Sequence, residues 1–165
     1  MTIDPYLAEF IGTFFLLLLG NGVVANVNLK NTIAEGQTPW VLITTAWAFA
    51  VFVGVFITGQ FSGAHLNPAV TIGLVVANKF SWLLVPGYLI AQVLGAMAGS
   101  WICYVIYIDH YRLTKEEGVV RSTFCTGSVI RNLKNNFFSE FVGTFVLVFG
   151  VLFIAIPNIE IEGMV

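Results

Sequence analysis

Long apolar stretches free of charged residues divide the chain. Asp, Glu, Lys and Arg are absent from four segments: Glu9 to Lys30, Glu35 to Lys79, Lys79 to Asp109 and Glu140 to Glu160. A helix that crosses a membrane needs about 20 predominantly apolar residues. The pattern therefore predicts four membrane-spanning helices, near residues 6–28, 40–60, 82–108 and 138–157.

One polar segment, residues 62–71, interrupts this pattern between two apolar runs. Asn is a favoured N-cap and Pro is tolerated at the first helical position, so Asn67-Pro68 predicts the start of a short helix over 67–78. The residues just before a helix start are not helical. Non-helical backbone is tolerated at membrane depth only in protein or beside a water-filled cavity. We therefore expect the carbonyls of Gly63, Ala64 and His65 to face a channel.

The segment SGAHLNPAVTIG, Ser62 to Gly73, resembles the first signature loop of the aquaporin (major intrinsic protein) family. The upstream sequence most resembles the glycerol-facilitator branch of that family. The resemblance implies an all-α membrane protein with an aquaporin-like helical bundle. In this chain the bundle is expected in truncated form, with four transmembrane helices and one re-entrant half-helix.

The resemblance also implies which residues contact the solute. Asn67, Pro68 and Ala69 begin the half-helix beside the path, and the loop carbonyls before them accept hydrogen bonds. Trp47 matches the position that forms one apolar wall of the narrowest constriction in the family. Two other interpretations of Trp47 stay open, a place in the interfacial aromatic belt and a packing contact between helices.

An internal repeat links the two ends of the chain. The motif at 8–14, AEFIGTF, recurs at 139–145 as SEFVGTF, and three predicted spans separate the copies. An odd number of spans makes the repeat inverted. We expect residues 1–136 to form the first repeat and 137–165 to begin the second, whose remainder is missing. By resemblance, Glu9 and Glu140 brace the pore-loop backbone of their halves. The alternative places both carboxylates at the lipid headgroups.

Composition agrees with a membrane protein. Apolar residues make up 58% of the chain and charged residues 10%, with a mean hydropathy of +0.89, whereas soluble domains carry about 25% charged residues. The start, Met1-Thr2-Ile3-Asp4, lacks the pattern of a cleaved signal, so we expect the first span to be retained. No basic face indicates nucleic acid. The loop before the fourth span is rich in Lys and Arg, which conflicts with the orientation that the family implies.

The predicted function is passive transport of glycerol or other small neutral solutes and water through a channel. The chain by itself is expected to be incomplete. The alternatives are a non-conducting truncated remnant, a water-selective channel or, less favoured, a secondary transporter. No enzyme activity, cofactor or metal site is expected. The partners are the lipid bilayer and the solutes, and the resemblance implies a homo-tetramer in the cell membrane as a multi-pass protein.

Small residues recur every four positions on the third span, at Ala91, Gly95 and Gly99, and the same spacing joins Gly59 to Gly63. Such faces let helices approach closely in lipid. They predict a compact bundle.

Overall fold

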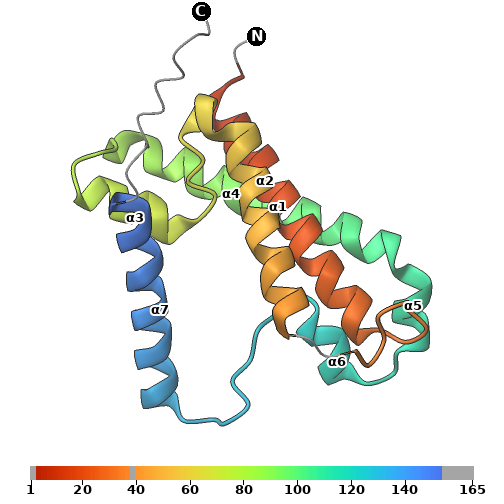
Figure 1. The fold of residues 1–165 in the computed structure, drawn as a ribbon. Coiled ribbons are helices and arrows are strands. Elements are labelled where there is room, and N and C mark those ends of the chain that lie inside the picture. The colour runs from red at the N-terminus through yellow and green to blue at the C-terminus, as the bar shows by residue number, and fades with distance from the viewer. Residues whose placement is uncertain (1–2, 38–39, 154–165) are drawn as a thin grey trace, which may run out of the picture. The chain divides into compact units, whose positions relative to one another are not determined.

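The computed structural model describes residues 3–37 and 40–153, and all regular structure within these ranges is helical. The elements in chain order are α1 (Pro5–Asn28), α2 (Trp40–Ser62), α3 (Pro68–Val76), the 3-10 turn η1 (Trp82–Leu84), α4 (Val85–Ile106), α5 (Ile108–Leu113), α6 (Glu117–Ser122) and α7 (Leu133–Phe153) (Figure 1). Among the described residues, four helical segments are long and apolar enough to cross a membrane: Pro5–Asn28, Trp40–Ser62, Trp82–Ile106 and Leu133–Phe153. The all-α membrane fold with four spans and one half-helix is confirmed.

The observed helix boundaries differ most from the predicted ones where a charged residue was used to predict a helix end. The fourth span begins at Leu133 instead of 138 and includes Lys134, because a helix can extend past the apolar layer into the charged flank. The last predicted residues of this span, 154–157, lie outside the described residues. The segment between the third and fourth spans was expected to be a loop, yet it contains α5 and α6.

The first helix starts where its sequence provides a cap. Oδ1 of Asp4 accepts hydrogen bonds from the backbone N–H groups of Tyr6 at 2.9 Å and Leu7 at 3.3 Å. Pro5 occupies the first turn, where a missing N–H costs no hydrogen bond. Asp4 and Pro5 together fix the start of α1.

The chain divides into two compact units, Met1–Arg131 and Asn132–Val165. In the first unit α1 packs along both α2 and α4 (Figure 1). The contact with α4 depends on two glycines, because a Cβ built at Gly95 would meet the carbonyl oxygen of Phe10, and one built at Gly99 would meet that of Phe14. The small face predicted on the third span is therefore the face against α1. The second unit contains α7 as its described helix.

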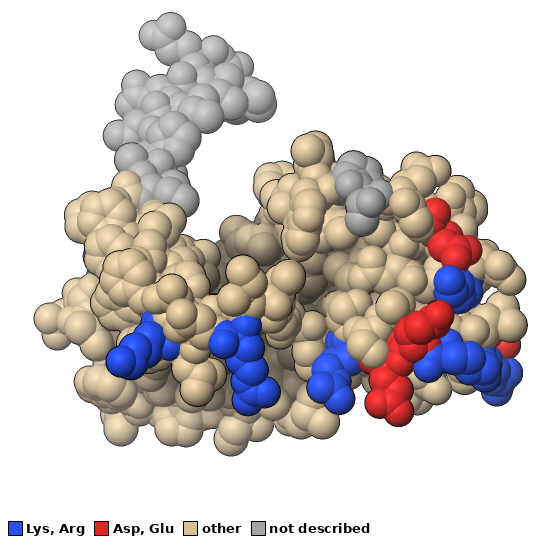
Figure 2. Space-filling model, turned by 90° about the horizontal axis from the view of Figure 1, so that it is seen from below, with Lys and Arg blue, Asp and Glu red and all other residues tan. Residues whose placement is uncertain are grey.

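A layer of polar loops and short helices covers one end of the first unit. The segment after α1 is tied to α5 through Lys30, whose N–H donates to Thr114 Oγ1 at 3.0 Å and whose carbonyl accepts from His110 Nδ1 at 2.9 Å. Acidic and basic side chains lie next to one another along this end (Figure 2). The exposed charged residues are Lys30, Glu35, Asp109, Arg112, Lys115, Glu116, Glu117 and Arg121.

A small apolar cluster anchors this layer to the ends of α1 and α4. Its buried members are Ala25, Leu29, Cys103 and Tyr111. The hydroxyl of Tyr111 lies 2.8 Å from Thr123 Oγ1, which ties α5 to the residue that follows α6. Burial raises the pKa of Tyr111 to about 12, and the hydrogen bond with Thr123 opposes that shift in part.

Alkaline pH should therefore destabilise the protein through Tyr111. The folded state holds the phenolic proton more tightly than the unfolded state, so the stability that Tyr111 contributes is complete below pH 10 and is lost as the pH rises through about 12. The loss is on the order of 2 kcal/mol. Unfolding in detergent micelles at pH 9–12.5 measures it, and Tyr111→Phe should flatten the decline. Tyr6→Phe, at a tyrosine that is 37% exposed, should keep the decline; equal curves for parent and Tyr111→Phe would contradict the assignment.

Candidate functional site

The backbone between α2 and α3 is not helical, as the sequence predicted for the residues before Asn67. Three residues of this loop have left-handed backbone, with φ of +80° at Gly63, +48° at Ala64 and +51° at Leu66. Such angles are uncommon for residues with a side chain. The loop therefore holds its shape only because surrounding groups fix it.

The carboxylate of Glu9 supplies most of that fixation. It is 0% exposed on α1 and accepts four hydrogen bonds. Oε1 accepts from Ser62 Oγ at 2.6 Å and His65 N at 2.9 Å, and Oε2 accepts from Leu66 N at 2.8 Å and Gln92 Nε2 at 2.8 Å. Four donors fill the acceptor capacity of a carboxylate. Glu9 thus holds the loop, α1 and α4 at one point.

A second set of polar contacts extends this network to α3. Gln92 Nε2 also donates to Thr71 Oγ1 at 3.0 Å, and His65 Nδ1 lies 3.1 Å from the same oxygen. Glu9 decides the orientation of the Gln92 amide, since the reverse orientation would place two oxygens against each other. The buried Oε1 of Gln92 has no hydrogen-bond partner among the described residues.

Aromatic rings hold the side chain of His65 from the other side. Its ring centroid lies 4.6 Å from that of Phe80 and 4.9 Å from that of Tyr88. The hydroxyl of Tyr88 donates to the carbonyl of Ser62 at 2.9 Å and so caps the end of α2. His65 is 8% exposed, which leaves it as a fixed part of the loop wall.

Leu66 locks the loop by packing into a notch made of glycines. A Cβ at Gly12 on α1 would meet Leu66 Cδ2, and one at Gly54 on α2 would lie 2.8 Å from Leu66 Cδ1. Two helices therefore lack side chains where the Leu66 methyl groups lie. Leu66 therefore holds the loop in two ways. Its backbone N–H donates to Glu9, and its side chain packs against Gly12 and Gly54.

The half-helix begins as its sequence dictates. Asn67 is the N-cap of α3, its Oδ1 accepts from Ala69 N at 2.8 Å, and Pro68 occupies the first turn. The cap uses the oxygen of the Asn67 side chain, so Nδ2 is the donor that this side chain can offer to another molecule. A helix N-terminus carries about half a positive charge and unpaired N–H groups. Gly63 is exposed and Ala64 and Asn67 are partly exposed.

Trp47 lies on the stripe of α2 that faces α1. Ala50, Gly54 and Thr58 are buried along this stripe, and Trp47 precedes them by helical spacing with its side chain half-buried. The position of Trp47 is not that of a residue facing only lipid. Glu140, the counterpart of Glu9 in the repeat, is exposed on α7. The structure brings together Glu9 and the loop residues 63–67, whereas Glu140 belongs to the other unit.

Several residues of this network were not singled out from sequence. Gln92 and Tyr88 carried a signal, because each is a polar group inside an apolar span and must find a partner there. Ser62 and Thr71 are common residues at helix ends and gave no such signal. Leu66 lies inside the loop motif, but it is apolar like its neighbours, so the sequence gave no sign of its own packing contact.

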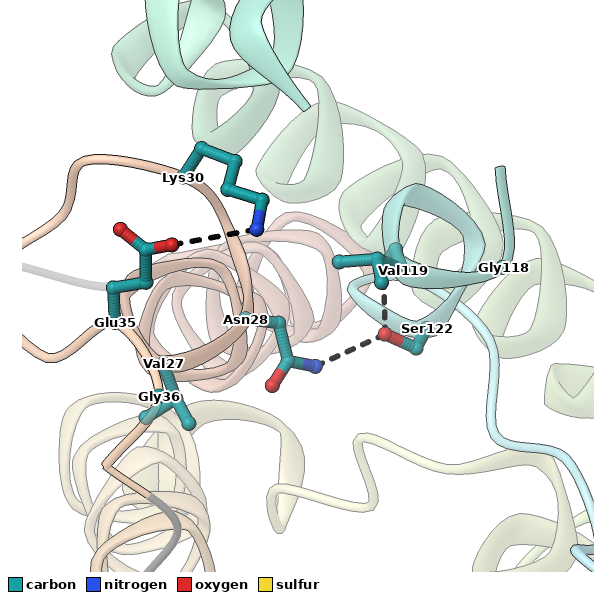
Figure 3. Close-up of a pocket in the computed structure, with 8 residues that line it drawn as sticks. All are labelled: Val27, Asn28, Lys30, Glu35, Gly36, Gly118, Val119 and Ser122. Atoms are coloured by element: carbon teal, nitrogen blue, oxygen red, sulfur yellow. Dashed lines mark hydrogen bonds and ion pairs between the residues drawn. The ribbon is translucent and has the colours of Figure 1, made fainter. Parts of the chain in front are cut away.

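A separate hollow of about 390 Å³ opens at the charged end of the first unit (Figure 3). The Lys30 ammonium and Glu35 carboxylate pair across it at 3.6 Å, and Asn28 Nδ2 donates to Ser122 Oγ at 3.0 Å. Four of its polar side chains are paired with one another in this way. Within residues 3–37 and 40–153, no group of three His, Cys, Asp or Glu side chains is placed to hold a metal ion.

Comparison with known proteins decides the family. The sequence model described as Major intrinsic protein matches residues 2–164. The chain belongs to the major intrinsic protein family. As a major intrinsic protein with four membrane-capable helices, it is an integral, multi-pass membrane protein.

Similar members of the major intrinsic protein family carry glycerol-facilitator names. The chain is 48% identical over 146 residues to the glycerol uptake facilitator protein 3 of Lactiplantibacillus plantarum, with 88% of this chain and 60% of the relative covered. It is 43% identical over 152 residues to the glycerol uptake facilitator protein of Streptococcus pneumoniae, covering 92% and 64%. The chain thus spans less than two thirds of either relative.

A solved structure shares the same fold. The aquaglyceroporin from Plasmodium falciparum superposes with a TM-score of 0.62 at 40% sequence identity, over 67% of this chain and 44% of that one. These relatives place the chain in the glycerol-facilitator branch that the sequence upstream of the loop indicated.

Proposed function

We propose that this chain provides the pore loop, the half-helix and one filter wall of a passive channel for glycerol, other small neutral solutes and water. The observation that carries the proposal is the non-helical loop at 63–66, held by a buried carboxylate and ending in the N-cap Asn67 between apolar spans. Backbone of this kind at membrane depth is tolerated beside a water-filled path. The names of the relatives support the choice of glycerol.

The chemistry of the loop suits a hydroxylated solute. Removing a hydroxyl from water without a replacement hydrogen bond costs about 2–7 kcal/mol. The carbonyls of Gly63, Ala64 and His65 would accept hydrogen bonds from the solute, and Asn67 Nδ2 would donate one. The positive end of α3, which begins with Pro68 and Ala69, disfavours cations, a mechanism that is general for aquaporin-type pores. No covalent step is needed, which supports a role other than an enzyme.

The same proposal assigns a place to the rest of the chain. Residues 1–136 would form the first repeat, and 137–165 would begin the inverted second repeat, in which Glu140 would brace a loop as Glu9 does. We further propose a homo-tetramer in the plasma membrane. Chemical crosslinking in native membranes, followed by denaturing electrophoresis, would show a four-subunit limit.

Passive flux in liposomes tests the proposal. The chain is reconstituted alone and together with a restored second half of the channel, and glycerol entry is followed by stopped-flow light scattering, with and without a protonophore. Glycerol flux that exceeds the flux of protein-free liposomes and is unchanged by the protonophore supports the channel. Loss of flux with the protonophore indicates a coupled transporter. Flux at the lipid background favours the non-conducting alternative. Asn67→Asp is the matched variant, because Asp is an equally good N-cap yet lacks Nδ2 and adds a negative charge, so glycerol flux should fall.

In a channel whose second half is restored, replacing Trp47 should change the choice of solute. Trp47→Ala removes a large apolar surface from the proposed constriction, so water permeability should rise and discrimination between polyols should weaken. Permeability ratios for glycerol, larger polyols and water in liposomes measure this. Trp101→Ala is the control, since that side chain is 63% exposed. Unchanged ratios for Trp47→Ala would leave Trp47 with a packing role alone.

A further inference from the structure

Helix α1 has no side chain at the point where the Trp47 ring lies. Gly20 is buried on α1, and a Cβ added there would fall on Cζ3, Cη2 and Cε3 of Trp47, all closer than the 3.0 Å that real Cβ atoms essentially never cross. The six-membered ring of the indole therefore rests directly on the backbone of Gly20. By contrast, a Cβ at Gly22, two residues further along α1, would meet nothing within 4 Å.

The backbone of α1 cannot retreat from that ring. Asn21, next to Gly20 and 2% exposed, donates Nδ2 to Ser100 Oγ on α4 at 2.9 Å. The α4 backbone also lies so close behind α1 that a Cβ at Gly99 would meet Phe14 O and approach Leu18 N to 3.1 Å. A methyl group at position 20 would therefore lie between the backbone of α1, which α4 holds in place, and the Trp47 ring, which can turn about two rotatable bonds. The ring is the part that would move.

We propose that Gly20 is a specificity-determining residue, which sets the width of the solute path by seating the Trp47 ring against the backbone of α1. The inference rests on the proposed function for its effect on transport. Because α1 lies on one side of the half-buried ring, displacement takes the ring away from α1, and the inference places the solute path on that other side. A side chain at position 20 would narrow that path without touching the solute.

Four variants separate this role from general packing. Gly20→Ala should lower the ratio of glycerol to water permeability about tenfold or more, the effect expected of one extra methyl-sized group in a tight site. Gly22→Ala should leave the ratio at the parent value. Phe in place of Trp47 lacks the outer ring atoms that meet position 20, so Gly20→Ala in a Trp47→Phe chain should match Trp47→Phe alone.

Two flux results would overturn the inference. One is an unchanged ratio in Gly20→Ala. The other is an equal drop with and without Trp47→Phe, because Gly20 would then act through another contact. Should Gly20→Ala fail to accumulate in membranes, recovery by Trp47→Phe supports the seating contact, and failure of the double variant overturns it.

A fluorescence measurement keeps the inference testable when the parent shows no glycerol flux, a result that would sink the proposed function alone. Trp40, Trp82 and Trp101 are 75%, 63% and 63% exposed and can be replaced by Phe to leave Trp47 as the single tryptophan. Acrylamide quenching of Trp47 should then change with Gly20→Ala and stay constant with Gly22→Ala. Identical quenching in all three chains would show that the ring does not rest on position 20.

Discussion

Replacing Glu9 with glutamine is expected to cost more stability than any other single polar substitution in the first unit. The glutamine amide keeps one oxygen but presents an NH₂ group to two of the four donors that Glu9 now satisfies. Each buried donor left without an acceptor costs about 1–3 kcal/mol, so the expected loss is on the order of 2–6 kcal/mol. Removing a buried charge recovers only part of this, because the backbone N–H groups of His65 and Leu66 remain donors on both sides of the side chain.

Denaturant unfolding in detergent micelles, followed by near-ultraviolet circular dichroism, measures the effect of Glu9→Gln. The matched control is Glu35→Gln, at a half-exposed carboxylate whose ion pair with Lys30 spans 3.6 Å. Exposed pairs contribute about 0–1 kcal/mol. Glycerol flux should fall in Glu9→Gln and stay constant in Glu35→Gln. Equal stability losses in the two variants would mean that the buried network does not hold the loop.

Adding one methyl group to the α1–α4 contact is expected to have the second largest effect. Gly95→Ala and Gly99→Ala each place a Cβ against a backbone carbonyl of α1, those of Phe10 and Phe14. Backbone cannot rotate away as a side chain can, so the helices must separate. Each variant should lose about 1–3 kcal/mol of unfolding free energy. The double variant should lose less than the sum, because one separation relieves both contacts.

A matched control exists on α2. A Cβ at Gly59 would meet nothing within 4 Å. Ala is favoured over Gly inside a helix by about 1 kcal/mol, so Gly59→Ala should be neutral or stabilising in the same unfolding assay. If Gly59→Ala and Gly95→Ala were equally destabilising, the close approach of α1 to α4 would not explain the requirement for glycine.

The sequence predicted the elements of this fold with good accuracy for a physical reason. A membrane-spanning helix must satisfy its own backbone hydrogen bonds and present apolar side chains to lipid. Its length and composition can therefore be recognised in the local sequence. The start of α3 is equally local, since Asn67 and Pro68 cap and begin the helix that they precede. The prediction was wrong at the start of α7. This helix begins at Leu133 and continues beyond the apolar stretch that the charged residues delimit.

The partners within the site were decided by the tertiary structure. The same four-residue spacing of small residues occurs at Gly59–Gly63 and at Gly95–Gly99, yet only the second pair meets a neighbouring helix. Glu9 was assigned a bracing role by resemblance, but its donors come from residues 53 to 83 positions away. Leu66 and Gly20 gave no signal, because their importance depends on the atoms of Gly12 and Trp47 that folding brings against them. Hydropathy and caps act along the chain, whereas close packing and buried hydrogen bonds act across it, and these depend on which helices become neighbours.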